Sequence, residues 1–342
     1  MKKRLTVAAL TAALACAGAA GQAFAADLKI NDHVTLGGAI EVEVSHSEDF
    51  EGASETSIDL ATAKFALETE VNEWASGVLA IEWDGDADKF AVDEAFVKLG
   101  ETEAMPAYLK GGRFVVPFGV YDANTLADPL TKEAFETKED NLLVGVAAGP
   151  VTVDAFVYKG ETNEGGGDAS IDKYGLAVGY ARENDMLTVG VHASYTNSLF
   201  DSDGLQEVFD PEADYVGGVA LQTSVQIVGV GLIGEYITAI DDYEAVDMLS
   251  GENVKRKPSA YHVEVSYSLD MAMPLIFAVG YSETEELAGV FPEKRIMGTV
   301  GIELAEGVGF SVGFSRDTDY GVGDGGAGED ADSLTAQLAY EF

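Results

Sequence analysis

The stretch Pro106-Ala-Tyr-Leu-Lys-Gly-Gly-Arg-Phe-Val-Val-Pro-Phe-Gly119 begins as a strand and ends in residues that a strand interior disfavours. Pro117 has no backbone N–H to donate and Gly119 has no side chain to pack, so we expect regular strand pairing to stop there. The following residues, 120–140, carry both acids and bases and include Asp128-Pro129. A long charged loop inside a regular β pattern usually has a function of its own. We therefore predict a functional loop at this point.

Most of the remaining chain alternates between apolar and polar residues, which is the pattern of a strand with one apolar face. Residues 34–45, 174–180, 261–267 and 333–342 show this alternation clearly. About sixteen such runs of about ten residues follow one another, and a tilted strand of that length crosses an outer membrane. The sequence therefore predicts an all-β fold, a transmembrane antiparallel β-barrel.

The connections between these runs alternate in length. Residues 149–150 and 183–185 are short turns, whereas residues 197–213 and 321–332 are long loops. Barrels of the outer membrane combine short periplasmic turns with longer outer loops. We therefore expect long acidic loops on the outer side and both chain termini on the periplasmic side.

A soluble β-sandwich or a solenoid would also show alternating residues. A solenoid needs a fixed sequence repeat, which this chain lacks. A sandwich of this length would normally be divided into domains. Tyr261 and Tyr267 bracket Val263 and Val265, as expected for an aromatic girdle where lipid meets water. We therefore predict that residues 26–342 form a single outer-membrane barrel domain.

The amino terminus has the three parts of a secretory signal peptide. Residues 1–4 are basic, residues 5–20 are apolar, and Ala23-Phe24-Ala25 is an A-x-A cleavage site. We predict that residues 1–25 are a cleaved signal peptide and that the mature chain lies in the outer membrane of a Gram-negative cell. The one cysteine, Cys16, lies in the cleaved segment, so no disulfide is expected in the mature chain.

The formal net charge of -40 argues against nucleic acid as a partner, because phosphates would be repelled. Acidic clusters such as Asp201-Ser-Asp203, Asp241-Asp242 and residues 324–332 offer carboxylates to divalent cations. None of them has the spacing of a defined calcium loop, so we interpret them as solvated loop charges. We predict neither a metal site nor a cofactor.

If the apolar faces contact lipid, the alternate residues line the lumen. Charged side chains need water or a partner there, and a barrel of about sixteen strands leaves an aqueous channel. A lumen filled by loops, with charges paired across it, is a compatible alternative. Alternation places these further side chains inward: Lys64, Glu82, Glu94, Asp154, His192, Glu235, His262, Glu264 and Arg295.

We predict that the loop of residues 120–138 folds inward and narrows the channel, because its apolar side chains would otherwise face water. The glycine pair Gly111-Gly112 is expected to form a bulge that turns Arg113 towards the lumen, whereas strict alternation would point it at lipid. The predicted pore-lining and constriction residues are Glu41, Glu43, Lys98, Lys110, Arg113, Asp122, Asp128, Lys132, Glu133, Glu136 and Lys138.

The run from Tyr108 to Gly119, followed by Ala127-Asp-Pro-Leu-Thr131 and Glu136-Thr137, resembles the LbtU-type siderophore porins. This resemblance implies an outer-membrane pore and ferric siderophore as a solute. The chain shows neither a plug domain before the barrel nor an energy-coupling box, so it does not resemble a TonB-dependent receptor.

The sequence thus favours a passive water-filled porin that prefers cations, because carboxylates outnumber amines on the predicted lumen face. A general diffusion porin for small solutes, a structural surface protein and an outer-membrane hydrolase are the alternatives. A hydrolase would need a histidine near a serine and an acid, and no local motif frames His33, His46, His192 or His262. We therefore expect no enzyme activity. The expected partners are outer-membrane lipid and small solutes, cations or ferric siderophore, with a homotrimer as the candidate assembly.

Overall fold

Antiparallel strand pairing forms the fold of the described part of the chain. The computed structural model describes residues 28–342 except 85–88, 103, 164–169, 185, 207, 210, 211, 213 and 245–254. The predicted signal peptide lies outside the described residues.

The strands and the helix have the following bounds: β1 Leu28–Asn31, β2 Val34–Glu48, β3 Ser54–Asn72, β4 Ala75–Asp84, β5 Lys89–Thr102, β6 Met105–Val115, α2 Leu130–Phe135, β7 Lys138–Ala148, β8 Val151–Tyr158, β9 Lys173–Asn184, β10 Leu187–Thr196, β11 Gly218–Ile227, β12 Val230–Ala239, β13 Ser259–Leu269, β14 Leu275–Glu285, β15 Lys294–Ala305, β16 Val308–Thr318 and β17 Asp330–Glu341.

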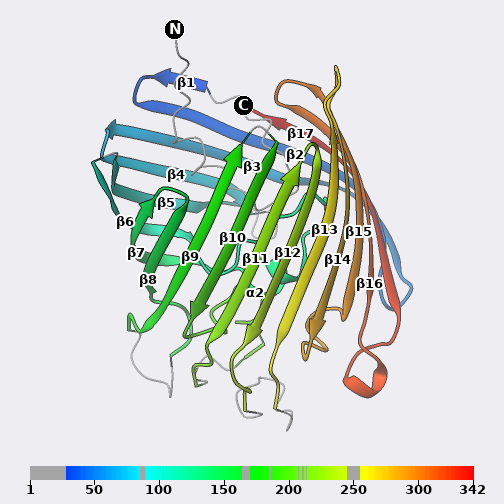
Figure 1. The fold of residues 1–342 in the computed structure, drawn as a ribbon. Helices are drawn as coiled ribbons and strands as arrows, with labels where there is room; N and C mark the ends of the chain where they lie inside the picture. Colours follow the sequence, from blue (N-terminus) through cyan, green and yellow to red (C-terminus); the bar gives the residue numbers. More distant parts are fainter. Residues whose placement is uncertain are drawn as a thin grey trace.

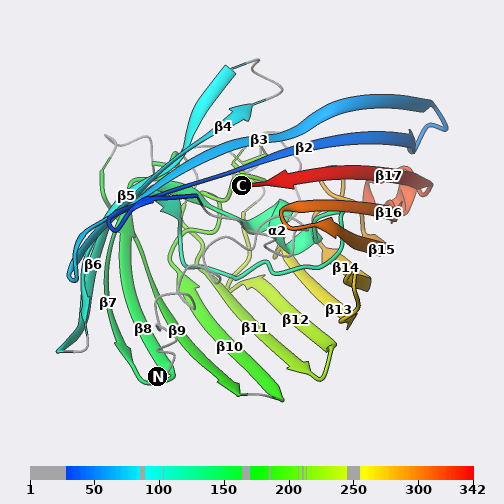
Figure 2. The same ribbon diagram turned by 90° about the horizontal axis from the view of Figure 1, so that it is seen from above.

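The strands β2 to β17 form a closed antiparallel barrel of 16 strands (Figures 1 and 2). Each strand pairs with its neighbours in the sequence, and β17 closes the ring by pairing with β2, with Tyr340 opposite Ile40. The short strand β1 pairs with the first residues of β2. The predicted fold class is therefore confirmed. Closure leaves no unpaired edge in the ring, as lipid requires.

Short turns and long loops lie at opposite ends of the barrel. Figure 1 shows the short turns at the upper end, together with β1 and the carboxyl end of β17, and the long loops at the lower end. The connection between β7 and β8 spans 149–150, whereas the connection between β10 and β11 spans 197–217. This arrangement matches the predicted alternation of connections.

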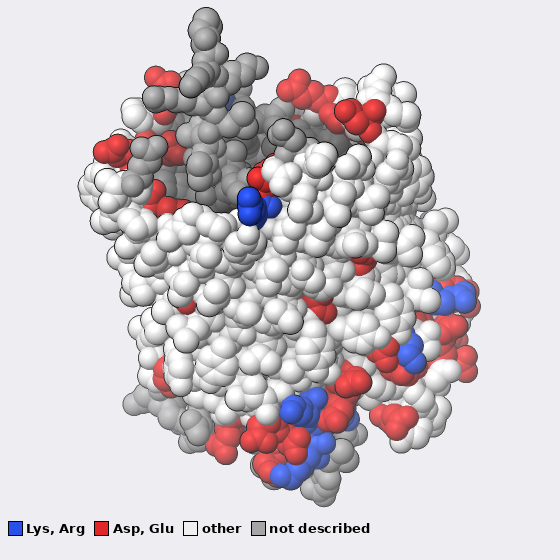
Figure 3. All heavy atoms as spheres, in the orientation of Figure 1, with Lys and Arg blue, Asp and Glu red and all other residues white. Residues whose placement is uncertain are grey.

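The outer face of the strands is apolar and the inner face polar. On β13, Val263 and Val265 are 48% and 54% exposed, whereas the alternating His262 and Glu264 are 0% and 2% exposed. Figure 3 shows a broad band nearly free of charge, with charged side chains above and below it that gather most densely at the end of the long loops. Such a band is the surface that a barrel presents to lipid. No helix within the described ranges is long and apolar enough to cross a membrane.

A β-bulge in β5 changes which side chains reach the lumen. The pairing of β4 with β5 shifts so that Ala80 lies opposite Glu94 and Ile81 opposite Val92, which leaves Asp93 as the extra residue of a β-bulge. By contrast, β6 pairs with β5 and β7 without a shift through Gly111-Gly112. The bulge predicted at these glycines is therefore wrong.

Without that bulge, Arg113 keeps its place in the ordinary alternation of β6. It lies next to Phe114, which is 2% exposed and packs against the inward Phe96. Arg113 is paired across the strands with Ala95 and the exposed Asp140. Because successive side chains of a strand point to opposite faces, Arg113 belongs to the outer face and not to the predicted lumen set.

Candidate functional site

The segment between β6 and β7, residues 116–137, lies inside the barrel, and we call it the inner loop. Figure 2 shows its helix α2 within the ring of strands. The helix contacts β12, β13 and β14, which lie across the lumen from β6. The loop is therefore folded inward, as the sequence predicted.

A buried carboxylate on β12 holds the first part of the inner loop. Glu235, which is 4% exposed, accepts hydrogen bonds from the backbone N–H groups of Val120 at 2.8 Å and Tyr121 at 3.2 Å. Its other oxygen accepts a bond from the Thr131 hydroxyl at 2.9 Å. These bonds satisfy a charge that would otherwise be costly to bury.

The neighbouring strand β13 repeats this arrangement one step further along the loop. Glu264 accepts hydrogen bonds from the backbone N–H of Asn124 at 2.9 Å and from its side-chain amide at 2.6 Å. The N–H of Thr125 lies 3.3 Å from the same carboxylate. On β15, Thr299 Oγ1 accepts a bond from the N–H of Leu126 at 2.7 Å. Successive loop residues are thus bound by successive parts of the wall.

An arginine on β15 fastens the helical end of the inner loop. Arg295 donates two hydrogen bonds to Asp317 on β16, at 2.7 and 2.8 Å, which fix the direction of its guanidinium group. The same group donates to the carbonyl of Asp128 at 2.9 Å and forms an ion pair with Glu133. Its side chain is only 11% exposed. We call the inner face of β10 to β15, which holds the inner loop in this way, the loop-covered wall.

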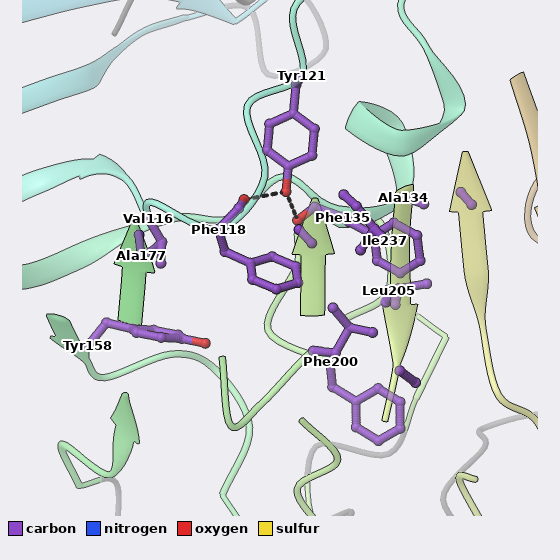
Figure 4. Close-up of a cluster of buried hydrophobic side chains, with 14 of the residues drawn as sticks. Val116, Phe118, Tyr121, Ala134, Phe135, Tyr158, Ala177, Phe200, Leu205 and Ile237 are labelled. Atoms are coloured by element: carbon purple, nitrogen blue, oxygen red, sulfur yellow. Dashed lines mark hydrogen bonds between the residues drawn. The ribbon is translucent and has the colours of Figure 1, made fainter. Parts of the chain in front are cut away.

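An aromatic core fills the space between the inner loop and the outer loops. Phe118 and Phe135 are buried, and the Tyr121 hydroxyl lies 2.7 Å from the carbonyl oxygens of both (Figure 4). Beyond them Phe200, from the loop after β10, stacks on Tyr243 with ring centroids 3.6 Å apart. This part of the lumen is filled by loops, as the alternative sequence interpretation proposed.

The inner loop and the loop after β10 are also joined by polar contacts. The Ser202 hydroxyl donates to the carbonyl of Ala134 at 2.8 Å, and the N–H of Asp203 donates to the carbonyl of Glu136, also at 2.8 Å. The loop after β10 therefore covers the inner loop at the end of the barrel where the long loops lie.

The opposite inner face, from β2 to the start of β7, carries charged side chains that bind one another, and we call it the charged wall. Asp93 at the bulge of β5 forms ion pairs with Lys64 of β3 and Lys138 of β7. Lys64 also lies 3.7 Å from Glu82. The Asp93 side chain is 6% exposed, while those of the two lysines are 34% and 25% exposed.

The predicted residues Glu41, Glu43, Lys98 and Lys110 all belong to the charged wall. Glu41 accepts a hydrogen bond from Thr62 at 2.6 Å, and Glu43 accepts one from Gln337 at 2.9 Å. Lys98 forms an ion pair with Glu101 and lies 4.8 Å from the ring centroid of Tyr108. Lys110 lies 3.7 Å from the ring centroids of Phe96 and Phe114, a cation–π arrangement.

The six predicted residues of the loop region are Asp122, Asp128, Lys132, Glu133, Glu136 and Lys138. Lys132 and Asp128 bind each other at 2.9 Å, while Glu133 and Lys138 are bound to wall residues. The prediction that these charges all face the channel is therefore only partly right, because several of them fasten the loop.

Asp122 of the inner loop lies near two other carboxylates, those of Glu235 and Glu264. Gln222 of β11 donates a long hydrogen bond from Nε2 to Asp122 Oδ2, at 3.4 Å. Burial, together with the nearby carboxylates of Glu235 and Glu264, raises the pKa of Asp122 to about 7. Burial also raises the pKa of Glu136.

Four residues important to this geometry were absent from the predicted site: Asp93, Glu235, Glu264 and Arg295. Strand alternation placed the last three on the lumen face but gave no sign that they bind the inner loop. Asp93 was missed because the bulge turns an apparently outward residue inward.

One histidine does have a serine and an acid beside it. His262 Nδ1 lies 3.0 Å from Ser282 Oγ, and its Nε2 lies 3.9 Å from Glu264 Oε2. His262 and Ser282 are both 0% exposed, and Glu264 is bound to the inner loop. A substrate cannot reach Ser282 in this arrangement. Within the described ranges, no group of His, Cys, Asp or Glu is arranged to hold a metal ion.

Sequence comparison links the chain to proteins with uninformative names. No family model matches it. A UPF0422 protein of Coxiella burnetii is 26% identical over 301 residues, covering 84% of this chain and 64% of the relative. A UPF0422 protein of Legionella pneumophila subsp. pneumophila is 23% identical over 356 aligned residues, covering 90% of this chain and 66% of the relative. The chain therefore spans just under two thirds of the length of these relatives.

Structural comparison identifies the class of fold. The anion-selective porin from Comamonas acidovorans has a TM-score of 0.63 at 12% identity, over 90% of this chain and 99% of that chain. OmpF of Salmonella typhi, in complex with daunomycin, has a TM-score of 0.61 at 15% identity, over 92% and 100%. The outer-membrane channel DcaP of Acinetobacter baumannii has a TM-score of 0.61 at 13% identity, over 90% and 97%.

These neighbours define the chain as a barrel of the outer-membrane porin type. Its closed ring and apolar outer band are the features by which such barrels fit a lipid bilayer. The finer resemblance to LbtU-type siderophore porins stays a prediction.

Proposed function

We propose that the chain forms a passive, water-filled channel whose narrowest part lies between the inner loop and the charged wall. One observation carries this proposal: charged side chains such as Lys64, Glu82 and Lys138 remain a quarter to a third exposed inside the barrel. Partly exposed charges on an inner wall need water, and a continuous aqueous path is what a passive channel requires.

The same surfaces support a preference for cations. The inward acids of the charged wall include Glu41, Glu43, Glu82, Asp93 and Glu94, and the inner loop adds Asp122, Asp128 and Glu136. The lysines on these two surfaces are fewer: Lys64, Lys98, Lys110, Lys132 and Lys138. An excess of carboxylates concentrates cations at a channel constriction.

A planar bilayer experiment tests both parts of this proposal. In a gradient of KCl, the reversal potential should show a higher permeability for K⁺ than for Cl⁻, and this preference should weaken as salt screens the charges. A protein that inserts into the bilayer without forming conducting channels contradicts the channel. A reversal potential of the opposite sign contradicts the cation preference alone.

Ferric siderophore as the solute rests on the resemblance of residues 108–137 to siderophore porins. The alternative is general diffusion of small solutes. Liposome swelling separates the two, because ferric siderophore should enter faster than sugars of similar size only if the channel favours it. Equal rates would favour general diffusion. A purely structural surface protein would leave the liposomes unswollen.

We propose no enzyme activity for the barrel, since Ser282 is covered. Ser282→Ala should leave conductance unchanged and should remove no esterase activity. A loss of measurable hydrolysis in this variant would support a hydrolase instead.

The remaining proposals concern processing and assembly. We propose cleavage after Ala25 and a homotrimer in the membrane. Amino-terminal sequencing of the mature protein and native mass measurement in detergent test these two points separately.

A further inference from the structure

We propose that Asp93 sets the ion selectivity of this channel by holding two lysines, Lys64 and Lys138, against the charged wall. The inference rests on the proposed channel function and identifies a specificity-determining residue outside the predicted set. It begins from the bulge in β5, which adds a residue between Val92 and Glu94.

The bulge brings two adjacent acids to the same side of the sheet. In a regular strand Asp93 and Glu94 would point to opposite faces. Glu94 lies opposite Ala80, which is 2% exposed on the inner side, and Asp93 is bound to the inward Lys64. Bulges commonly re-aim a side chain in this way. The extra residue therefore supplies the lumen with one carboxylate more than alternation allows.

The position of Asp93 lets one carboxylate bind two ammonium groups. One oxygen receives Lys64 from β3, and the other receives Lys138 from the start of β7. Each of these strands is separated from β5 by one strand, on opposite sides of it, so the lysines reach Asp93 from two directions. With its 6% exposure, Asp93 lies behind the lysines and is itself nearly hidden from the lumen.

Lys138 lies where the inner loop rejoins the barrel. The preceding residue, Thr137, accepts a backbone hydrogen bond from Val116 at 2.8 Å, so the two ends of the loop meet here. A lysine released at this point would project beside the proposed passage. Without Asp93, Lys64 and Lys138 would gain freedom and repel each other and passing cations.

The test compares Asp93→Asn with Glu94→Gln, a matched control. Both substitutions remove one negative charge from the same bulge. Among the described residues, Asp93 is in direct ion-pair contact with Lys64 and Lys138, whereas Glu94 acts on these lysines and on Lys110 only at longer range. The ratio of K⁺ to Cl⁻ permeability, taken from reversal potentials, should fall by about threefold or more in Asp93→Asn and by less than about twofold in Glu94→Gln.

A double-mutant cycle separates release of the lysines from simple loss of charge. Lys138→Gln should change the permeability ratio more in the Asp93→Asn background than in the wild-type background, because only there is the lysine released. Heat-modifiable mobility of each variant in gels shows whether the barrel is assembled.

Equal permeability ratios for Asp93→Asn and Glu94→Gln in assembled barrels would overturn the inference, as would additive effects in the cycle. If Asp93→Asn does not assemble, a variant that keeps Asp93 and combines Lys64→Gln with Lys138→Gln provides the alternative test. This double variant should have a higher ratio of K⁺ to Cl⁻ permeability than the wild-type channel. Absence of conductance in the wild-type protein would instead contradict the channel function itself.

Discussion

The two inner walls of this barrel use charged residues in opposite ways. On the loop-covered wall, Glu235 and Glu264 are buried and accept hydrogen bonds from the backbone of the inner loop. On the charged wall, Asp93 binds both Lys64 and Lys138, and the two lysines stay partly exposed. One wall therefore uses charge to position a loop, and the other uses it to line a passage.

This difference shows why an inward charge has no fixed meaning in a barrel. A buried carboxylate is stable only where donors satisfy it, and the backbone N–H groups of the inner loop provide those donors. A partly exposed carboxylate or ammonium group keeps contact with water, so it needs fewer hydrogen bonds from the protein to be stable. Partner type thus distinguishes structural charges from candidates for ion selectivity, since Asp93 is nearly as buried as Glu235 but binds lysines and not the backbone of the inner loop.

The largest effect should come from a change that disrupts both walls. Phe342 and Gly38 exchange two backbone hydrogen bonds, at 2.7 and 3.0 Å, where β17 meets β2. Tyr340 stacks on Phe342 with ring centroids 5.6 Å apart. Deleting residues 340–342 should leave unassembled protein in the periplasm, because the ring cannot close fully.

Cell fractionation and heat-modifiable gel mobility measure this effect. Removing three residues from the tip of the loop after β16, 322–324, gives a control of equal length that leaves the closing pairs intact. Normal assembly of the protein lacking residues 340–342 would contradict the role of these residues in closure.

The next effect should come from removing the element that separates the two walls. Deleting residues 122–136 takes away α2 and most of the inner loop but no strand pairing of the ring. Single-channel conductance should rise by roughly twofold or more, and larger sugars should enter liposomes, since pore width controls both. The barrel should still assemble. An assembled variant with unchanged conductance would place the constriction elsewhere.

Strand alternation was the main basis for predicting the barrel and most of its inward-facing residues. Residues on β13 illustrate the reason: Val263 and Val265 alternate with His262 and Glu264, and a period of two leaves only one arrangement of faces. The inward fold of the inner loop was also predictable, because Phe118 and Phe135 would otherwise face water.

Alternation could not identify the partners of the inward residues. The hydrogen bonds that Val120 and Tyr121 donate to Glu235 join residues more than a hundred positions apart, and no local pattern predicts such a contact. Bulges are a second limit to prediction from alternation, because one extra residue in a strand changes the face of the sheet to which the adjacent side chains point. Asp93 sits at a bulge that was not foreseen, and Gly111-Gly112 lack the one that was.

A matched pair of substitutions tests the comparison of the walls directly. Glu235→Ala would leave three loop donors without their acceptor, at a cost of roughly 2 kcal/mol or more to loop docking. Glu43→Ala removes the same side chain from the charged wall, where its partner is Gln337 and not the inner loop.

We expect Glu235→Ala to increase fluctuations of the open-channel current, and Glu43→Ala to alter mainly the reversal potential. Both variants should assemble, because neither change affects backbone pairing. Similar current fluctuations in the two variants would remove the distinction between an anchoring wall and a lining wall.

The smallest effect should come from the protonation of Asp122, which lies between the anchors Glu235 and Glu264. Docking raises the pKa of this acid to about 7, from ~4 in a free loop. The docked loop therefore holds the proton through a pH range in which the free loop has lost it. Docking becomes less favourable as pH rises through that range, by at most about 1.4 kcal/mol per pH unit, and the cost is constant above pH of about 7. Asp122→Asn removes this dependence while leaving Glu235 and Glu264 in place. Current fluctuations of the wild-type channel should thus exceed those of Asp122→Asn more strongly at pH of about 8 than at about 5. A difference that stays constant, or that grows towards acid, would show that Asp122 is charged in the docked loop and that the loop-covered wall tolerates another anion.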